Sequence, residues 1–260
     1  MEIESTNLLK ALHILTRDGK LNADSRRKLK QVQHLTQLIE PLIMKLHVKQ
    51  NRINLVDVGA GKSYLGFILY DLILKRLEEA HVTSIESRAE LIEKSKLLAS
   101  QSGFERFHFI ADSIESAHIE HPVDLVCALH ACDTATDDAI LFGLKNGAQA
   151  FALVPCCQAE VARELAKLKE DPFKLSALYK FPIHTREFGS HLTNVFRTLF
   201  LKAHGYKVTV TELVGFEHSM KNELILAEKV SDDTHPATKR AQEELLELQV
   251  RFNVKMKLLT

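Results

Sequence analysis

Side chains that could do chemistry gather directly after two predicted strands. The first group, after a strand at 124–129, could remove a proton from a substrate or bind it: His130, Asp133 and Asp137. The second group, after a strand at 149–154, is the adjacent pair Cys156 and Cys157. A thiolate there could attack a substrate, join a metal site with His130 and Cys132, or line a tight pocket. The local cysteine spacing typical of zinc sites is missing, so we expect no metal, while the other two roles stay open.

A third polar segment, 183–194, lies between the fifth predicted strand and a helix expected near 191–204. It is dense in groups that form hydrogen bonds: His184, Arg186, Glu187, His191 and Asn194. Phe188 in the same segment could stack on a nucleic-acid base. Ser190 could cap the following helix. We expect this segment to contact the substrate.

A glycine-containing turn indicates which ligand binds next to these groups. The sequence NLVDVGAGKSYLG at 54–66 reads as a buried strand, a turn and the start of a helix. Gly59, Ala60 and Gly61 would let the backbone approach a ligand closely, and the helix would point its N–H groups toward it. A Walker A loop needs a glycine where Val56 stands, and a dinucleotide fingerprint needs one where Tyr64 stands. These two residues exclude both phosphate-binding alternatives.

The remaining pattern resembles the first motif of class I S-adenosylmethionine-dependent methyltransferases. Asp57, Gly59 and Gly61 match its Asp-x-Gly-x-Gly, which wraps the methionine end of the cofactor in that family. Glu86, followed by Ser87, stands at the end of the next strand, where family members bind the ribose. The resemblance therefore implies S-adenosylmethionine as the cofactor.

The same resemblance assigns two further segments to the cofactor. Family members place an acidic or polar residue near the adenine after the third strand, where this chain has Asp112 and Ser113. An ordinary role for this pair as a helix cap fits equally well. The loop after the fourth strand faces the methyl group in the family, which puts His130 beside the cofactor as well as the substrate.

Three motifs in order narrow the resemblance: 59–65, 129–137 and the cysteine pair at 156–157. They are similar to a branch that includes the methyltransferase-like protein 25 group, the C-terminal domain of the glutathione-S-transferase C-terminal-domain-containing protein and the tRNA acceptor-stem ribose methyltransferases. The similarity covers residues 28–229. The tRNA enzymes carry Gly and His where this chain has Asp133 and Gln158, and Ser63 replaces a glycine common in the first motif. The resemblance thus supports methyl transfer more firmly than it supports tRNA as the substrate.

Strand and helix patterns alternate from residue 53, which predicts a parallel sheet with helices on both faces. Strands are expected at 53–58, 82–86, 107–111, 124–129 and 149–154, with an antiparallel pair at 206–214 and 222–229. Helices are expected near 64–77, 88–101, 135–145, 158–169, 191–204 and 237–250. With the resemblance, this pattern implies an α/β fold class, a Rossmann-like seven-stranded methyltransferase sheet, mostly parallel with an antiparallel last strand. We expect a helical extension at 1–50, interrupted at Pro41, a methyltransferase domain at 51–230 and a helical tail at 231–260.

Charge is balanced over the chain but not along it. Lys plus Arg and Asp plus Glu both number 34, so nothing in the overall composition indicates nucleic-acid binding. Up to Arg52, however, ten basic residues face five acidic ones. A basic helical face could bind RNA phosphates, although an ordinary solvated surface also explains it.

Composition also bears on the compartment of the protein. There is neither a signal-peptide pattern nor a run of about 18 apolar residues, so we expect a cytoplasmic protein without a membrane partner. The four cysteines cluster in the predicted core and do not form a secreted disulfide framework. We expect no DNA partner, and the sequence does not set the oligomeric state.

The favoured hypothesis is an S-adenosylmethionine-dependent methyltransferase that modifies RNA, tRNA or rRNA. Catalysis would consist of positioning plus removal of a proton, with His130 or Asp133 as the base. Two alternatives remain: a methyltransferase for a protein or small molecule, and a non-catalytic binding module that keeps the fold.

Overall fold

The structure is a computed structural model that describes residues 3, 5–12, 14–15, 20, 23–129, 131–155, 158–168, 175–213 and 223–260. Within these ranges, none of the helices combines the length and the apolar character that crossing a membrane requires.

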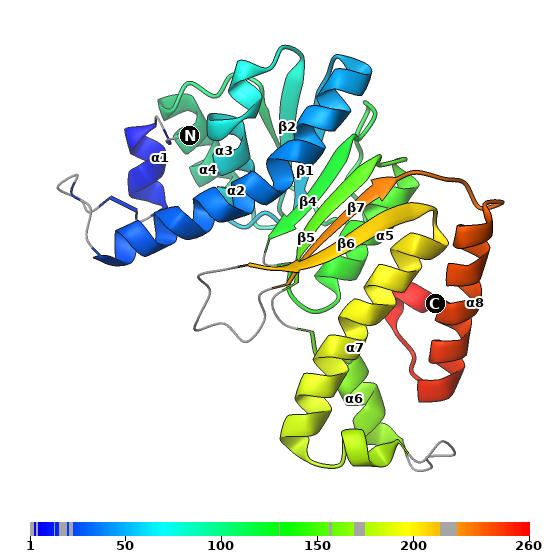
Figure 1. Ribbon diagram of the computed structural model, residues 1–260. Coiled ribbons are helices and arrows are strands. Elements are labelled where there is room, and N and C mark those ends of the chain that lie inside the picture. Colours follow the sequence, from blue (N-terminus) through cyan, green and yellow to red (C-terminus); the bar gives the residue numbers. More distant parts are fainter. Residues whose placement is uncertain are drawn as a thin grey trace.

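Seven strands form one sheet in the order β3-β2-β1-β4-β5-β7-β6 (Figure 1). Strand β7 is antiparallel to both of its neighbours, and all other pairs are parallel. The predicted α/β fold class with its antiparallel last strand is confirmed. The strands are β1 Ile53–Val58, β2 Ala80–Ile85, β3 Phe107–Ile110, β4 Leu125–Leu129, β5 Ala150–Val154, β6 Tyr206–Glu212 and β7 Glu223–Lys229.

Helices cover both faces of the sheet (Figure 1). Successive residues of a strand point to opposite faces, so each strand contributes to two hydrophobic clusters. Leu55 of β1 belongs to the cluster that contains α1, α2 and α3, whereas Val56 belongs to the cluster with α5, α7 and α8. The α-helices are α1 Thr6–Ala11, α2 Ala23–Gln50, α3 Tyr64–Leu72, α4 Ala89–Gln101, α5 Ala135–Lys145, α6 Glu160–Lys167, α7 Pro182–Ala203 and α8 Pro236–Phe252.

Helix α2 continues through Pro41, so the predicted interruption there is wrong. A proline inside a helix removes one hydrogen bond and crowds the preceding turn, at a cost of about 3 kcal/mol or more. Ile39, Ile43 and Leu46 are buried against the sheet. Burying each such side chain contributes about 1.5–3 kcal/mol, which offsets the cost of the proline.

Helix α7 begins at Pro182 and not near residue 191. The segment 183–190, expected as a loop, therefore forms the first two turns of this helix, and Ser190 lies inside it instead of capping it. Proline suits the first helical position because its fixed φ is already helical and its missing N–H would have no helical partner. Helices α6 and α7 pack closely at Gly189, where an added Cβ would lie 2.6 Å from the Cα of Ala162.

Candidate active site

Two glycines allow the sharp turn that follows β1. Gly59 has φ +60° and Gly61 has φ +57°, a left-handed conformation that costs glycine little. The N–H of Ala60 donates to the carbonyl of Ile85 at the end of β2, at 3.1 Å. A Cβ on Gly59 would lie 3.6 Å from Cδ1 of Ile114 and would narrow the space beside the loop after β3. The turn thus lies at the carboxyl ends of β1 and β2.

Asp57 is buried beside this turn, with 1% of its surface exposed. Its Oδ2 accepts a hydrogen bond from the N–H of Gly66, at 3.1 Å, in the first turn of α3. Burial raises the pKa of Asp57 to about 7, and the hydrogen bond from Gly66 opposes part of this shift. Asp57 therefore anchors α3 to the end of β1 and also borders the cavity over the turn.

Glu86 follows β2 and holds the turn from the other side. Its Oε2 accepts from the N–H of Gly61 at 2.8 Å. Its Oε1 accepts from the N–H of Arg88 at 3.1 Å and from Nε of the same residue at 2.8 Å. Burial acts to raise the pKa of Glu86, but these hydrogen bonds and the charge of Arg88 outweigh it and lower the pKa below its usual value. Glu86 is an ionised acceptor at neutral pH.

Two cavities adjoin at Gly59. The first, about 230 Å³, is bordered by Asp57, the glycine turn and Arg88. The second, about 310 Å³, is bordered by Glu86 with Ser87 on one side and by Asp112 with Ser113 on the other. Of the residues predicted to bind the cofactor, the structure therefore brings all the described ones to one edge of the sheet.

The residues of this edge fit S-adenosylmethionine. A glycine cradle that a Cβ would narrow lies next to an ionised carboxylate, and such a carboxylate can accept hydrogen bonds from both ribose hydroxyls. Asp112 and Ser113 are engaged in a local turn, because Asp112 Oδ1 accepts from the N–H of Ser113 at 2.7 Å and from Oγ of Ser116 at 2.8 Å. They cap this turn, and their role near the adenine stays a prediction.

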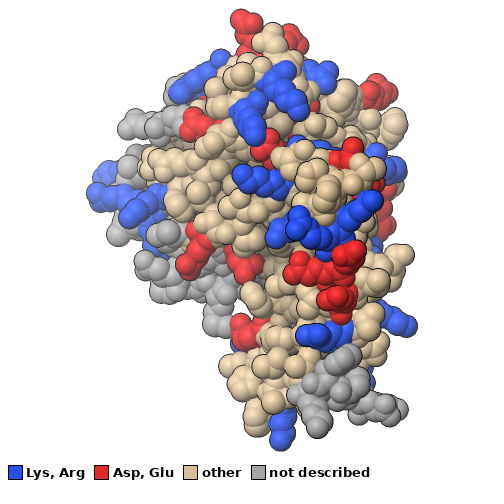
Figure 2. All heavy atoms as spheres, turned by 45° about the vertical axis from the view of Figure 1, so that its right-hand side comes forward, with Lys and Arg blue, Asp and Glu red and all other residues tan. Residues whose placement is uncertain are grey.

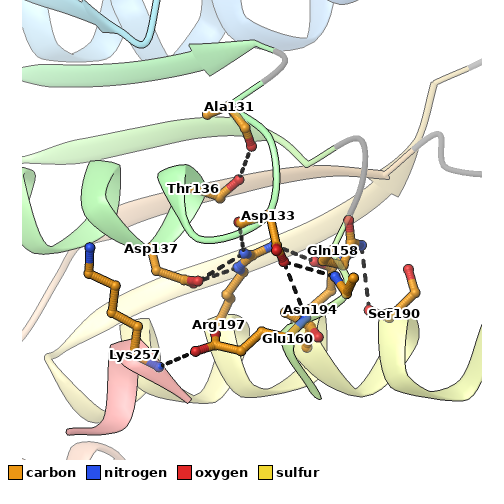
Figure 3. A network of polar contacts seen from close by, with 12 residues as sticks. Ala131, Asp133, Thr136, Asp137, Gln158, Glu160, Ser190, Asn194, Arg197 and Lys257 are labelled. Carbon is orange, nitrogen blue, oxygen red and sulfur yellow. Dashed lines mark hydrogen bonds and ion pairs between the residues drawn. The ribbon is translucent and has the colours of Figure 1, made fainter. Parts of the chain in front are cut away.

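A buried polar network lies beside the site, on the α5–α7 side of the sheet (Figure 3). Arg197 and Asp137 are both 1% exposed and form an ion pair, with Nε 2.7 Å from Oδ1. Arg197 Nη2 also donates to the other oxygen of Asp137 at 3.1 Å and to the carbonyl of Asp133 at 2.7 Å, and Nη1 donates to Asn194. Burial raises the pKa of Asp137, and the hydrogen bonds from Arg197 oppose the shift. Both carboxylate oxygens of Asp137 are thus occupied inside the protein, which favours a structural role over proton transfer.

Asp133 joins the loop after β4 to the start of α6. Its Oδ1 accepts from the N–H groups of Ala159 and Glu160, at 2.8 and 3.2 Å, and its Oδ2 pairs with Arg163 at 2.8 Å. Burial acts to raise the pKa of Asp133, but these contacts outweigh it and lower the pKa. Asp133 also adopts φ +50°, a left-handed conformation that is uncommon for residues other than glycine. These contacts make it a weak base, so the predicted catalytic role has no support from the geometry.

The predicted substrate residues do not share one environment. His184 and Arg186 are exposed, and His191 is 69% exposed with Nδ1 4.0 Å from Glu223. Asn194 is buried, and its amide bonds both Arg197 and Glu223. Glu187 and Arg186 form an exposed ion pair. His130, Cys156 and Cys157 lie outside the described residues.

Arg197 was not predicted from the sequence. A faint signal exists, since Arg197 is embedded in the apolar run VFRTLF at 195–200. A charged side chain in the buried stripe of a helix needs a partner. The partner itself is 60 residues away in the chain and could not be identified from spacing.

Comparison with known proteins identifies the family. A family profile described as a methyltransferase domain matches residues 27–164, which is more than half of the chain. The chain belongs to this family. The predicted enzyme class, an S-adenosylmethionine-dependent methyltransferase, is thereby confirmed together with its cofactor. No curated protein sequence is significantly similar to this methyltransferase.

One solved structure supports the same fold. A Podospora anserina methyltransferase, PaMTH1, solved with bound S-adenosylhomocysteine, superposes with a TM-score of 0.51 and is 11% identical, over 86% of this chain and 88% of that chain. A putative RNA methyltransferase from Pyrococcus horikoshii is 15% identical with a TM-score of 0.45, over 88% of this chain and all of that one. The likeness to PaMTH1 concerns the fold alone.

Proposed function

We propose that this methyltransferase transfers the methyl group of S-adenosylmethionine to RNA. The observation that carries the proposal is the position of the basic end of α2 relative to the cofactor edge of the sheet. The motif resemblance to tRNA ribose methyltransferases and to the methyltransferase-like protein 25 group points in the same direction.

Helix α2 extends past the edge at which the cofactor residues lie. Its 28 residues span about 42 Å, whereas the six residues of β1 span about 20 Å. The last residue of α2, Gln50, lies next to the amino end of β1. From there the helix runs back across the sheet, so that its first turns lie toward the carboxyl ends of the strands (Figure 1). Its first turns carry the exposed side chains of Arg26 and Lys30, one helical turn apart. Cations placed there would contact the phosphates of an RNA whose target nucleotide enters the site.

The α8 side of the molecule offers a contrast. On the face shown in Figure 2, acidic and basic side chains are interspersed and do not form a continuous basic surface. Such a surface contributes little to phosphate binding, because attraction and repulsion cancel within a Debye length. The charge excess of the N-terminal region is therefore the feature that favours RNA.

Proton removal from the acceptor would fall to His130. Asp133 is held by α6 and Arg163, and Asp137 is held by Arg197. His130 follows β4 directly, at the carboxyl end where ligands of such sheets bind. The cysteine pair follows β5 in the sequence and stays a candidate for contact with the base.

Salt dependence of RNA binding tests the proposal. The logarithm of the RNA-binding constant falls as the logarithm of the salt concentration rises, and each phosphate contact that a mutation removes should make this slope shallower by about 0.7–0.9. The double substitution Arg26→Gln and Lys30→Gln should therefore make the slope shallower by about 1.5. The matched control, Lys202→Gln with Lys207→Gln, removes the same charge at the amino edge of the sheet and should leave the slope unchanged. Equal effects of the two double variants, or binding that ignores salt, would contradict the proposal.

A protein acceptor is the second candidate. Leu178, Phe181 and Ile183 are 48%, 56% and 57% exposed around the start of α7. Neighbouring exposed apolar side chains are typical of protein-binding surfaces. Transfer of a radiolabelled methyl group from S-adenosylmethionine to protein instead of RNA would favour this candidate.

A further inference from the structure

The guanidinium of Arg88 binds the carboxylate of Glu86 in a bidentate manner, with one contact to each oxygen. Nε lies 2.8 Å from Oε1, and Nη2 lies 3.3 Å from Oε2. This fork geometry matches a carboxylate with two donors side by side. The two hydroxyls of a ribose would present the same pattern of two adjacent donors to the same two oxygens.

Glu86 has no acceptor capacity left for a further pair of donors. An ionised carboxylate offers about four lone-pair sites. Two are taken by backbone N–H groups, those of Gly61 at 2.8 Å and of Arg88 at 3.1 Å. The Arg88 side chain makes two further contacts, and the hydroxyl of Ser87 lies 3.5 Å from Oε1, so all four sites are already in use. A ribose can therefore bind Glu86 only where the guanidinium leaves.

The side chain of Arg88 can swing away into solvent, whereas that of Glu86 is enclosed by the protein. The side chain of Arg88 is 59% exposed and that of Glu86 is 5% exposed. The guanidinium also lies on the cofactor side of the turn, since a Cβ on Gly61 would be 3.8 Å from Nη2. Arg88 borders the same cavity as Gly59 and Gly61.

We propose that Arg88 is a placeholder for the cofactor ribose: its guanidinium occupies the carboxylate oxygens of Glu86 that the ribose hydroxyls would use. Competition between Arg88 and the ribose for Glu86 thus sets the cofactor affinity. The arginine keeps a nearly buried carboxylate ionised and oriented, and the cofactor must displace it. The cost of this displacement weakens binding of every ligand that brings the ribose diol. The inference rests on the assigned cofactor and is independent of whether the acceptor is RNA.

Removing the placeholder should therefore tighten binding. An ion pair with one exposed partner is weak, so Arg88→Met should bind S-adenosylhomocysteine about two- to fivefold more tightly than the wild type. Arg88→Lys keeps the charge but cannot make the paired contact, and its affinity should lie between the two. Salt should screen the Arg88–Glu86 pair, so wild-type affinity should rise between about 0.05 and 0.5 M salt while that of Arg88→Met stays level.

Isothermal titration calorimetry with S-adenosylhomocysteine on the full chain tests this. The matched control is Lys96→Met, which removes one charge and one exposed ion pair, with Glu93, from the same helix that follows Glu86. The proposal expects tighter, salt-independent binding for Arg88→Met and wild-type behaviour for Lys96→Met.

Weaker or unchanged binding by Arg88→Met would overturn the placeholder, because Arg88 would then support or ignore the ligand. A shift shared by Lys96→Met would overturn it as well, since general charge would explain the effect. Absence of binding by the wild type would instead overturn the cofactor assignment, and failure of RNA methylation would leave the titration unaffected.

Discussion

Removing the buried guanidinium of Arg197 should destabilise the methyltransferase by about 3–5 kcal/mol. Arg197 and Asp137 are each 1% exposed, and Arg197 also satisfies Asn194 and the carbonyl of Asp133. Arg197→Met keeps most of the volume but leaves the carboxylate of Asp137 without its partner. The carboxylate must then be desolvated unpaired or take up a proton, and both cost free energy at neutral pH.

The pH dependence of this loss follows from Asp137. In Arg197→Met the folded-state pKa of Asp137 should rise further, because burial no longer meets the opposing effect of Arg197. Stability contributed by the protonated form is present below the unfolded-state pKa and is lost as pH rises through the folded-state value. The loss should therefore be larger at about pH 8 than at about pH 5.

Urea unfolding followed by far-ultraviolet circular dichroism measures this, since the chain contains no tryptophan. The double variant Asp137→Asn with Arg197→Met removes the unpaired charge and should recover most of the lost stability. A loss below about 1 kcal/mol in the single variant, or no recovery in the double variant, would refute the role of this ion pair.

Two further predictions concern stability. Because burial raises the pKa of Asp57 to about 7, the stability that its protonated form contributes is present below the unfolded-state pKa and lost as pH rises through 7. Relative to Asp57→Asn, the wild type should lose roughly 2–4 kcal/mol between about pH 4 and pH 8 in urea unfolding, and parallel pH profiles would contradict this. Gly189→Ala would gain about 1 kcal/mol of helix propensity, but its Cβ would lie 2.6 Å from the Cα of Ala162, so steric overlap should dominate with a net loss of about 1–3 kcal/mol. A melting temperature above that of the wild type would show that α6 and α7 separate without cost.

The centre of the sheet could be predicted from the sequence because β4 and β5 carry continuous apolar runs and β1 is nearly as apolar. Every residue of β1 is buried, and its predicted bounds, 53–58, are those observed. The glycine turn and Glu86 also follow from local spacing, since each stands directly after a strand. Local pattern failed where tertiary packing decides, as in α2, which runs through Pro41 because Ile39 and Ile43 are buried on either side.

The chemistry after β4 was harder to predict for the same reason. Asp133 and Asp137 look like free carboxylates in the sequence, but their partners Arg163 and Arg197 come from helices later in the chain. Likewise, the Arg88 contact with Glu86 needs a side-chain conformation that spacing alone does not specify. The sequence could identify the polar groups at the site, whereas which of them are already bound to other side chains depends on three-dimensional contacts.

Transfer of tritiated methyl from S-adenosylmethionine tests the central claim most directly. The purified protein would be incubated with total RNA and, separately, with protein extract, both from cells that lack it. We predict that label enters RNA, is released by ribonuclease and is absent for Glu86→Ala, which lacks the ribose acceptor. Label that enters protein, or none in either fraction while S-adenosylhomocysteine binds, would contradict an RNA methyltransferase.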